Sequence, residues 1–209
     1  MLLSRPHDSG AIAQFDLADT ASGMWLTDQA LKKAPIQLVI CRPCEPGKFL
    51  LGFTGDLASV EAAHSHVLGF GEALCIDHVL IHQGHQKLWD ALDENLGLPG
   101  QHGEQAESML SVECFTIAST LRALDRGLKT ADCRVLRLHL ADDYGGKGFF
   151  VLSGTLEDLQ AVEESCRAAA APRLVSSRLI AHPDADLPSA PAEGLTLTTL
   201  SGLRDTNNS

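Results

Sequence analysis

Cysteines and histidines that could bind a metal occur close together in the first half of the chain. Cys41 and Cys44 have the two-residue separation found in zinc sites and redox-active dithiols. A structural zinc site normally needs two further ligands at a matching spacing, and the sequence has no second pair of this kind. We therefore predict no metal site, and retain Cys44 as the alternative metal ligand. His78, His82 and His85 have no carboxylate placed with them, and are more typical of surface or interface histidines.

Motifs for enzymatic chemistry are missing from the sequence. It contains neither a Gly-x-Ser-x-Gly nor a His-Glu-x-x-His pattern. Gly145-Gly146-Lys147 resembles the end of a phosphate-binding loop, but Gly148 stands where that loop requires Ser or Thr. We therefore predict that the protein is not an enzyme.

Two short, acidic turns precede the Gly-Lys pairs at Lys48 and Lys147. Glycine permits a tight backbone turn with positive φ, and a short loop between strands projects a few side chains on a rigid support. The candidate site residues in the two turns are Cys44, Glu45, Pro46, Gly47, Asp142, Asp143, Tyr144, Gly145 and Gly146. For Glu45 the alternative is a solvated turn residue with no further role.

The elements that position these turns occur twice in the chain. Ala30-Leu31-Lys32-Lys33-Ala34 returns as Gly127-Leu128-Lys129-Thr130-Ala131, and Pro46-Gly47-Lys48 returns as Gly145-Gly146-Lys147. The copies stay in step except for two residues inserted before the second Gly-Lys. Only two copies exist and each is long enough for a domain, so the pattern predicts a tandem duplication rather than a solenoid.

Each copy has the pattern of a strand, a helix, two strands, a helix and a final strand. In the first copy we expect strands at 11–17, 36–41, 48–53 and 73–82, helices at 20–34 and from Asp56 through Val67, and an extra helix at 86–96. In the second copy we expect strands at 109–115, 133–140, 147–153 and 173–181 and helices at 117–130 and 156–170.

Composition narrows the class of protein. The chain has 209 residues, is 44% hydrophobic and carries a net charge of −11, which opposes sequence-independent binding to nucleic acid or anionic membranes. It has no apolar run long enough to span a membrane and no secretory signal. The six unevenly spaced cysteines suggest a cytoplasmic protein with reduced thiols.

The order, spacing and double occurrence of these segments resemble the bacterial microcompartment shell domains, in their tandem, trimer-forming version. The first copy is most similar to the trimeric type of propanediol-utilisation compartments. The resemblance implies an α+β fold with two ferredoxin-like domains at 9–96 and 107–184, a linker at 97–106 and a disordered tail at 185–209. It implies a pseudo-hexameric homotrimer in the microcompartment shell, with hexameric and pentameric shell proteins as partners. It also places Lys32 and Lys129 at the edges between tiles, where the alternative is two solvated helix ends.

The resemblance further implies that both turns surround the threefold axis and line a central pore for small metabolites. Three Glu45 carboxylates about 7 Å apart would repel by roughly 2 kcal/mol per pair at an effective dielectric near 20. We therefore expect a narrow, acidic pore that disfavours anions. The alternative function is a redox-active shell protein with an iron–sulfur cluster on the axis, but its ligand position falls on Glu45, beside Cys44. A more distant alternative is a small-molecule-binding regulator, since ferredoxin-like folds serve many functions.

Overall fold

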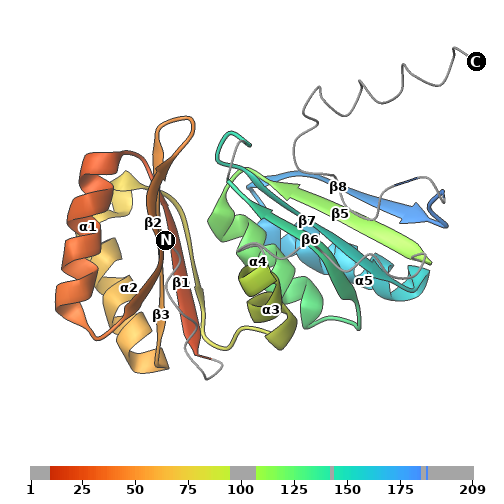
Figure 1. Ribbon diagram of the computed structural model, residues 1–209, viewed down its shortest axis with the longest axis horizontal. Coiled ribbons are helices and arrows are strands. Elements are labelled where there is room, and N and C mark those ends of the chain that lie inside the picture. The colour runs from red at the N-terminus through yellow and green to blue at the C-terminus, as the bar shows by residue number, and fades with distance from the viewer. Residues whose placement is uncertain (1–9, 95–106, 142–143, 185–186, 188–209) are drawn as a thin grey trace, which may run out of the picture.

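The two halves of the chain form two four-stranded antiparallel sheets with flanking helices (Figure 1). The computed structural model describes residues 10–94, 107–141, 144–184 and 187. The first half contains β1 (Ala11–Leu17), α1 (Thr20–Lys33), β2 (Gln37–Cys44), β3 (Lys48–Gly55), α2 (Leu57–Gly71), the 3₁₀ turn η1 (Glu72–Leu74), β4 (Cys75–Ile81) and α3 (Gln86–Glu94). The second half contains β5 (Ser108–Cys114), α4 (Ile117–Leu128), β6 (Arg134–Leu140), β7 (Gly148–Gly154), α5 (Leu156–Ala170) and β8 (Leu174–Ala181).

The sheets share one topology and one register. Sheet A has the strand order β2-β3-β1-β4 and sheet B the order β6-β7-β5-β8. Ala11 lies opposite Gly55 in sheet A, as Ser108 lies opposite Gly154 in sheet B. Both edge pairs, β2 with β3 and β6 with β7, also contain a register shift at the corresponding place. The predicted α+β fold with two ferredoxin-like units is therefore confirmed.

The predicted strand at 11–17 has the observed limits, and two of the others differ most from the observed strands. Strand β2 continues to Cys44 instead of ending at Cys41, because Cys44 still pairs with Lys48. Pro43 is tolerated because β2 is an edge strand and needs no second ladder of hydrogen bonds. Strand β4 begins at Cys75, because residues 72–74 form a 3₁₀ turn, whose last two residues were predicted as strand. The predicted helix at 86–96 is observed to Glu94, and its last two residues lie outside the described residues.

Helices and sheets alternate in layers. Helices α1 and α2 cover one face of sheet A, and α4 of the second half lies against its other face (Figure 1). Helices α4 and α5 cover one face of sheet B, and no helix of the described residues covers its remaining face (Figure 1). Within the described ranges, no helix is long and apolar enough to cross a bilayer.

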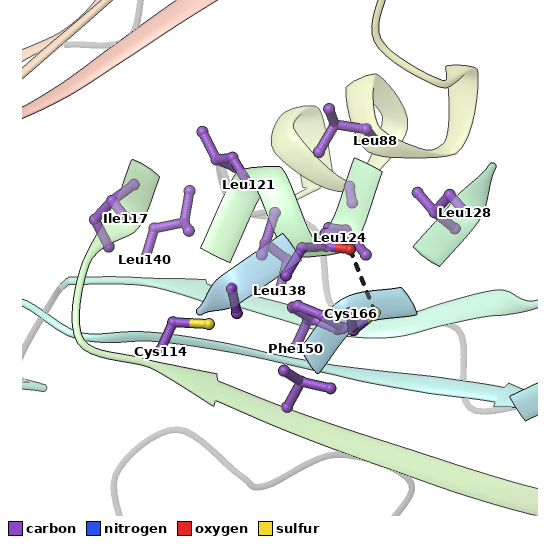
Figure 2. Close-up of a cluster of buried hydrophobic side chains, with 14 of the residues drawn as sticks. Leu88, Cys114, Ile117, Leu121, Leu124, Leu128, Leu138, Leu140, Phe150 and Cys166 are labelled. Atoms are coloured by element: carbon purple, nitrogen blue, oxygen red, sulfur yellow. Dashed lines mark hydrogen bonds between the residues drawn. The ribbon is translucent and has the colours of Figure 1, made fainter. Parts of the chain in front are cut away.

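The second hydrophobic core extends across the boundary between the two halves. Leu121, Leu124 and Phe150 lie at its centre, as Figure 2 shows. Val79 and Ile81 of sheet A belong to the same cluster, although they come from the first half. Burying such side chains contributes about 1.5–3 kcal/mol each, so the two halves are held together by a true core.

Helix α3 also contributes to the joint, as we call this contact between the two halves of the chain. Leu88 is fully buried in the second core, with Trp89, Ala91 and Leu92 close to buried. At the start of the helix, the Lys87 ammonium contacts Asp132 at 2.6 Å and donates to the carbonyl of Cys133 at 2.8 Å. The extra helix predicted at the end of the first copy therefore packs on the second half.

Candidate pore turns and assembly surfaces

The two turns that were predicted to work together lie against each other within one chain. The Lys48 ammonium donates to the carbonyls of Phe115, at 3.1 Å, and Gly146, at 3.4 Å. Gly146 has φ +69°, and a Cβ there would lie 2.4 Å from the carbonyl oxygen of Glu45. A side chain at this position would therefore separate the turns. The side chain of Glu45 itself is exposed.

Each turn is closed by its own backbone hydrogen bonds. In the first, the amide of Gly47 donates to the carbonyl of Cys44 at 3.0 Å, and Gly47 has φ +106°. In the second, the amides of Tyr144 and Lys147 donate to the carbonyls of Ala141 and Tyr144, both at 3.2 Å. Asp142 and Asp143 lie outside the described residues, so their predicted place in the pore stays a prediction.

Tyr144 folds back over the uncovered face of sheet B. Its ring makes edge contacts with His139 and Phe149, at centroid distances of 5.6 and 5.4 Å. Burial, followed by the nearby carboxylate of Glu113, raises the pKa of the Tyr144 hydroxyl. Lys147 binds Glu113 at 2.8 Å and lies 5.5 Å from the centre of the Tyr144 ring. The second turn therefore presents an aromatic and cationic group beside the acidic first turn.

Cys41 and Cys44 lie on opposite faces of β2. The Sγ of Cys41 is 3.8 Å from the Thr27 hydroxyl of α1, whereas Cys44 packs against the second hydrophobic core. The extended backbone causes this separation, because side chains three residues apart on a strand point to opposite sides. The pair cannot bind one ion together, and the described residues contain no cluster of three metal-ligating side chains. The thiol of Cys44 lies beside the second turn, 3.5 Å from where a Cβ of Gly146 would be, and the alternative of an iron–sulfur cluster there stays a prediction.

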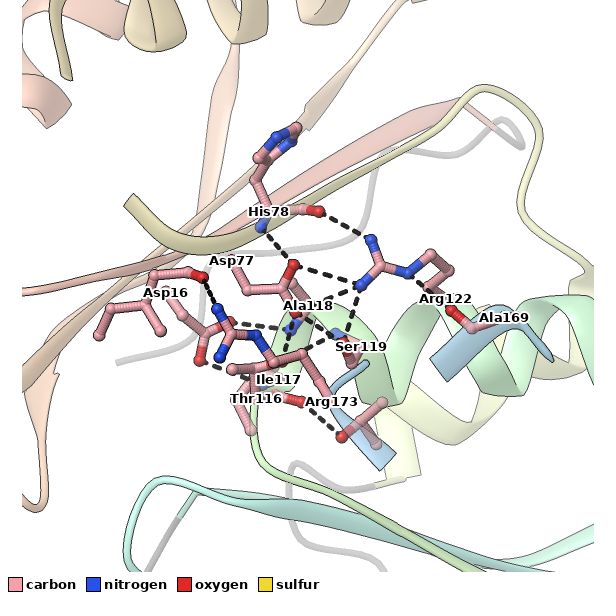
Figure 3. Close-up of polar contacts among 12 residues, drawn as sticks. Asp16, Asp77, His78, Thr116, Ile117, Ala118, Ser119, Arg122, Ala169 and Arg173 are labelled. Atoms are coloured by element: carbon pink, nitrogen blue, oxygen red, sulfur yellow. Dashed lines mark hydrogen bonds and ion pairs between the residues drawn. The ribbon is translucent and has the colours of Figure 1, made fainter. Parts of the chain in front are cut away.

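A buried polar contact joins the N-terminus of α4 to sheet A, as Figure 3 shows. The carboxylate of Asp16 accepts the amides of Ile117, at 3.1 Å, and Ala118, at 2.9 Å. These are two of the amides that a helix leaves unpaired at its start. Burial outweighs both hydrogen bonds and raises the pKa of Asp16 to about 6.

Asp77 completes this contact on the neighbouring strand (Figure 3). Its Oδ2 accepts the hydroxyls of Thr116, at 2.5 Å, and Ser119, at 2.6 Å, and its carboxylate binds Arg122 at 3.2 Å. Burial raises the pKa of Asp77, but these hydroxyls and the guanidinium outweigh it, so the net shift is downward. The sequence interpretation missed both aspartates, because only the register of sheet A places them opposite each other.

Helix α1 has the same position in the first repeat as α4 has in the second, but its matching surface is exposed. Because Leu31 aligns with Leu128, Met24 corresponds to Leu121 and Trp25 to Arg122. Met24, Trp25 and Leu31 are 58%, 45% and 46% exposed, whereas Leu121 and Leu128 are 0% and 5% exposed. No sheet of the described residues covers this surface of α1, whereas sheet A covers the equivalent surface of α4.

Sheet B has an uncovered face that corresponds to the face of sheet A under α4. Glu113 lies opposite Ser176 in the ladder, as Asp16 lies opposite Asp77. Ile180 is 37% exposed where the corresponding Ile81 is 6% exposed. One helix and one sheet face are therefore left unpaired, and each is the equivalent of a surface already paired inside the chain.

The two predicted edge lysines occupy equivalent places at the ends of α1 and α4. Lys32 binds Asp28 at 2.6 Å, and Lys129 binds Asp125, also at 2.6 Å. Lys129 also donates to the carbonyl of Gln83 at 2.6 Å. It borders a groove of about 1040 Å³ between β4, α4 and α5. Both lysines are exposed, and their predicted role at tile edges stays a prediction.

The predicted surface histidines include one that is built into the first core. His78 lies 3.1 Å from His64 of α2, between the ring nitrogens, and both rings pack against Phe15. His64 is 7% exposed, and burial together with His78 and His82 lowers its pKa to about 4. His82 is at the surface, 3.5 Å from Glu61.

Comparison with known proteins identifies the class to which this architecture belongs. A family model described as "BMC domain" matches residues 11–83 and 111–183. The chain therefore belongs to the BMC-domain family of microcompartment shell proteins, with two copies of the domain in tandem, and the predicted family is confirmed. It is 30% identical over 151 residues to the bacterial microcompartment shell protein PduT of Citrobacter freundii, covering 72% of this chain and 79% of that protein.

Solved structures share the fold. A microcompartment protein from Desulfitobacterium hafniense has a TM-score of 0.67 at 23% identity, over 83% of this chain and 95% of that one. A double-ringed trimeric shell protein of the RMM microcompartment has a TM-score of 0.61 at 16% identity, over 82% and 87%. A fused, permuted hexameric shell protein of the same compartment has a TM-score of 0.58 at 23% identity, over 77% and 84%.

Proposed function

We propose that three copies of this chain close into a pseudo-hexagonal, non-catalytic shell tile of a cytoplasmic bacterial microcompartment, with a central pore for small molecules. The pairing of α4 with sheet A carries the proposal. Repeating that pairing between chains places α1 of one copy on sheet B of the next. Each chain has one unpaired helix surface, on α1, and one unpaired sheet face, on sheet B. Three contacts around a threefold axis therefore pair all of these surfaces and close the ring.

The energetics favour closure. Met24, Trp25 and Leu31 are large apolar side chains clustered on one helix face, and a monomer would leave them in water. Each would contribute about 1.5–3 kcal/mol on burial. Association costs translational and rotational freedom, which opposes this gain. A single contact would therefore be marginal, whereas the three contacts of a closed ring give a stable trimer.

The ring would gather six turns of two kinds. Within each chain the turn at Glu45 already touches the turn at Gly146. A threefold axis at this end of the molecule would collect three exposed Glu45 carboxylates between the Tyr144 turns. A ring of like charges at a constriction repels solutes of the same sign, so the proposed pore passes neutral or cationic metabolites more readily than anions.

Solute leakage from assembled shells tests the pore. Shells containing Glu45→Gln should leak an anionic solute faster relative to a neutral solute of similar size than wild-type shells do. Glu157→Gln, which removes the same charge from the exposed start of α5, is the matched control. An unchanged ratio of anionic to neutral leakage in Glu45→Gln shells would refute the acidic pore.

The ring also presents edges to neighbouring tiles. Lys32 and Lys129 would lie at equivalent edge positions, six per trimer, where they could contact hexameric and pentameric shell proteins. Individually weak edge contacts can hold a sheet of tiles because many of them act together. Co-assembly of the trimer with a hexameric partner, followed by electron microscopy of the sheets, tests this part.

A further inference from the structure

The polar residues at the two helix-to-sheet contacts have opposite chemical roles. Inside the chain, the helix provides a hydroxyl at its N-cap, Thr116, and the sheet provides a carboxylate, Asp77. At the unpaired surfaces, the equivalent helix position is Asp19 and the equivalent sheet position is Ser176. The acid and the alcohol have therefore changed sides.

We propose that Ser176 of one copy donates a hydrogen bond to Asp19 of the next, and that this reversed pair restricts α1 to sheet B. The inference rests on the proposed trimer and adds which surfaces of the copies may pair. Asp19 caps α1 by accepting the amide of Ser22 through Oδ1 at 2.8 Å. Thr116 caps α4 in the same way, accepting the amide of Ser119 at 3.3 Å. The cap of α4 also contacts sheet A, since the Thr116 hydroxyl donates to Asp77.

The surroundings of Ser176 combine one carboxylate with two cations, because Lys147 binds Glu113 at 2.8 Å. Strand alternation places Ser176, Glu113 and Arg178 on the uncovered face of sheet B, since Ser177 faces α5 and bonds Glu163 there. Arg178 is exposed on this face, next to Ser176 along the alternation, and offers a nearby cation. Glu113 corresponds to Asp16, so it is positioned to accept the first amides of α1 from the neighbouring copy.

The exchanged pairings are unfavourable in both directions. Placing α1 on sheet A would bring Asp19 against Asp77, with Trp25 in place of the guanidinium of Arg122. Placing α4 on sheet B would leave Arg122 facing Ser176, where it requires a carboxylate. Mismatched charges at an interface discriminate against wrong partners more reliably than matched ones attract the right ones.

Two substitutions that each copy the other half of the chain test the pair. In Ser176→Asp, a second carboxylate meets Asp19, and the trimer should half-dissociate at a concentration at least tenfold higher than wild type. In Asp19→Thr with Ser176→Asp, the pair of Thr116 and Asp77 is rebuilt, and dissociation should return to within about threefold of wild type. Thr also caps helices well, so α1 should persist. Ser65→Asp, an exposed position on α2, adds the same charge elsewhere and should have no effect.

Native mass spectrometry over a dilution series separates the possible failures. If the wild-type chain is monomeric, the proposed function fails and this inference falls with it. If wild type is trimeric but Ser176→Asp behaves like Ser65→Asp, or Asp19→Thr gives no rescue, only the reversed pair is wrong. If Ser176→Asp does not fold by circular dichroism, Ser176→Ala replaces it: it should weaken the wild-type trimer and have no effect in Asp19→Thr, and an equal effect in both backgrounds would overturn the proposal.

Discussion

A charge placed on the exposed face of α1 should prevent closure of the ring while leaving the chain folded. Met24 is 58% exposed in the single chain, and its counterpart Leu121 is 0% exposed beneath sheet A. Met24→Asp would remove about 1.5–3 kcal/mol of apolar burial from each contact and add the desolvation of a carboxylate. Because a closed trimer has three such contacts, the loss is about 5–9 kcal/mol per ring, or roughly four to six orders of magnitude in the trimer dissociation constant.

Light scattering coupled to size exclusion measures this directly. Wild type should keep a mass of three times 22.3 kDa on dilution, and Met24→Asp should have the mass of one chain with an unchanged far-ultraviolet circular dichroism spectrum. Leu57→Asp is the control, because Leu57 is an apolar side chain 43% exposed on α2, outside the α1 face. The reasoning is refuted if Met24→Asp stays trimeric to the same dilution as Leu57→Asp.

Three further predictions concern the edge, the joint and the first core. Lys32→Ala should leave the trimer mass unchanged but reduce incorporation into shells, as measured by co-purification; a loss of trimer instead would place Lys32 at another interface. Asp77→Ala should lower the free energy of urea unfolding by about 2–3 kcal/mol, since it removes the acceptor of two hydroxyls and of Arg122, whose guanidinium keeps its bonds to two carbonyls; a change below about 1 kcal/mol would contradict the structure of the joint. The pKa of His64 is lowered to about 4 from 6.5, so the folded state binds fewer protons than the unfolded state and stability falls as the pH drops from 6.5 towards 4, by about 3 kcal/mol in all. The raised pKa of Asp16 has the opposite effect, because it adds stability as the pH falls below about 6. The contribution of His64 is therefore measured as the difference in unfolding free energy between wild type and His64→Gln at each pH. Identical pH profiles of the two proteins would contradict this prediction.

The sequence predicted what the repeat and local patterns encode. Apolar alternation and the double occurrence of the Gly-Lys turns were sufficient for the order of helices and strands along the chain and for two equivalent units. Local patterns failed where long-range pairing decides the outcome. Strand β2 extends through Pro43 to Cys44 because β3 provides partners that far, and this extension separates Cys41 from Cys44.

For the same reason, local sequence patterns could not predict how the two halves of the chain pack together. The stretch from Ile117 to Leu128 has its apolar residues on one face, which predicts a helix with one covered face, whereas the folded helix also buries Ser119, Thr120 and Asp125. The exposed Met24 and Trp25 become informative only when compared with the buried α4. The aspartates at 16 and 77 could be assigned only once the register placed them opposite each other, under the start of a helix that is distant in sequence.

The central claim is that α1 pairs with sheet B of a neighbouring copy, as α4 pairs with sheet A within the chain. A cryo-electron microscopy map of the purified particle tests it most directly. We predict a threefold ring in which Trp25 lies beside Ser176 of the neighbouring copy, as Arg122 lies beside Asp77 within the chain, and the three Glu45 turns surround the axis. A monomeric particle, or a trimer with α1 in solvent and Glu45 at the outer rim, would contradict the account.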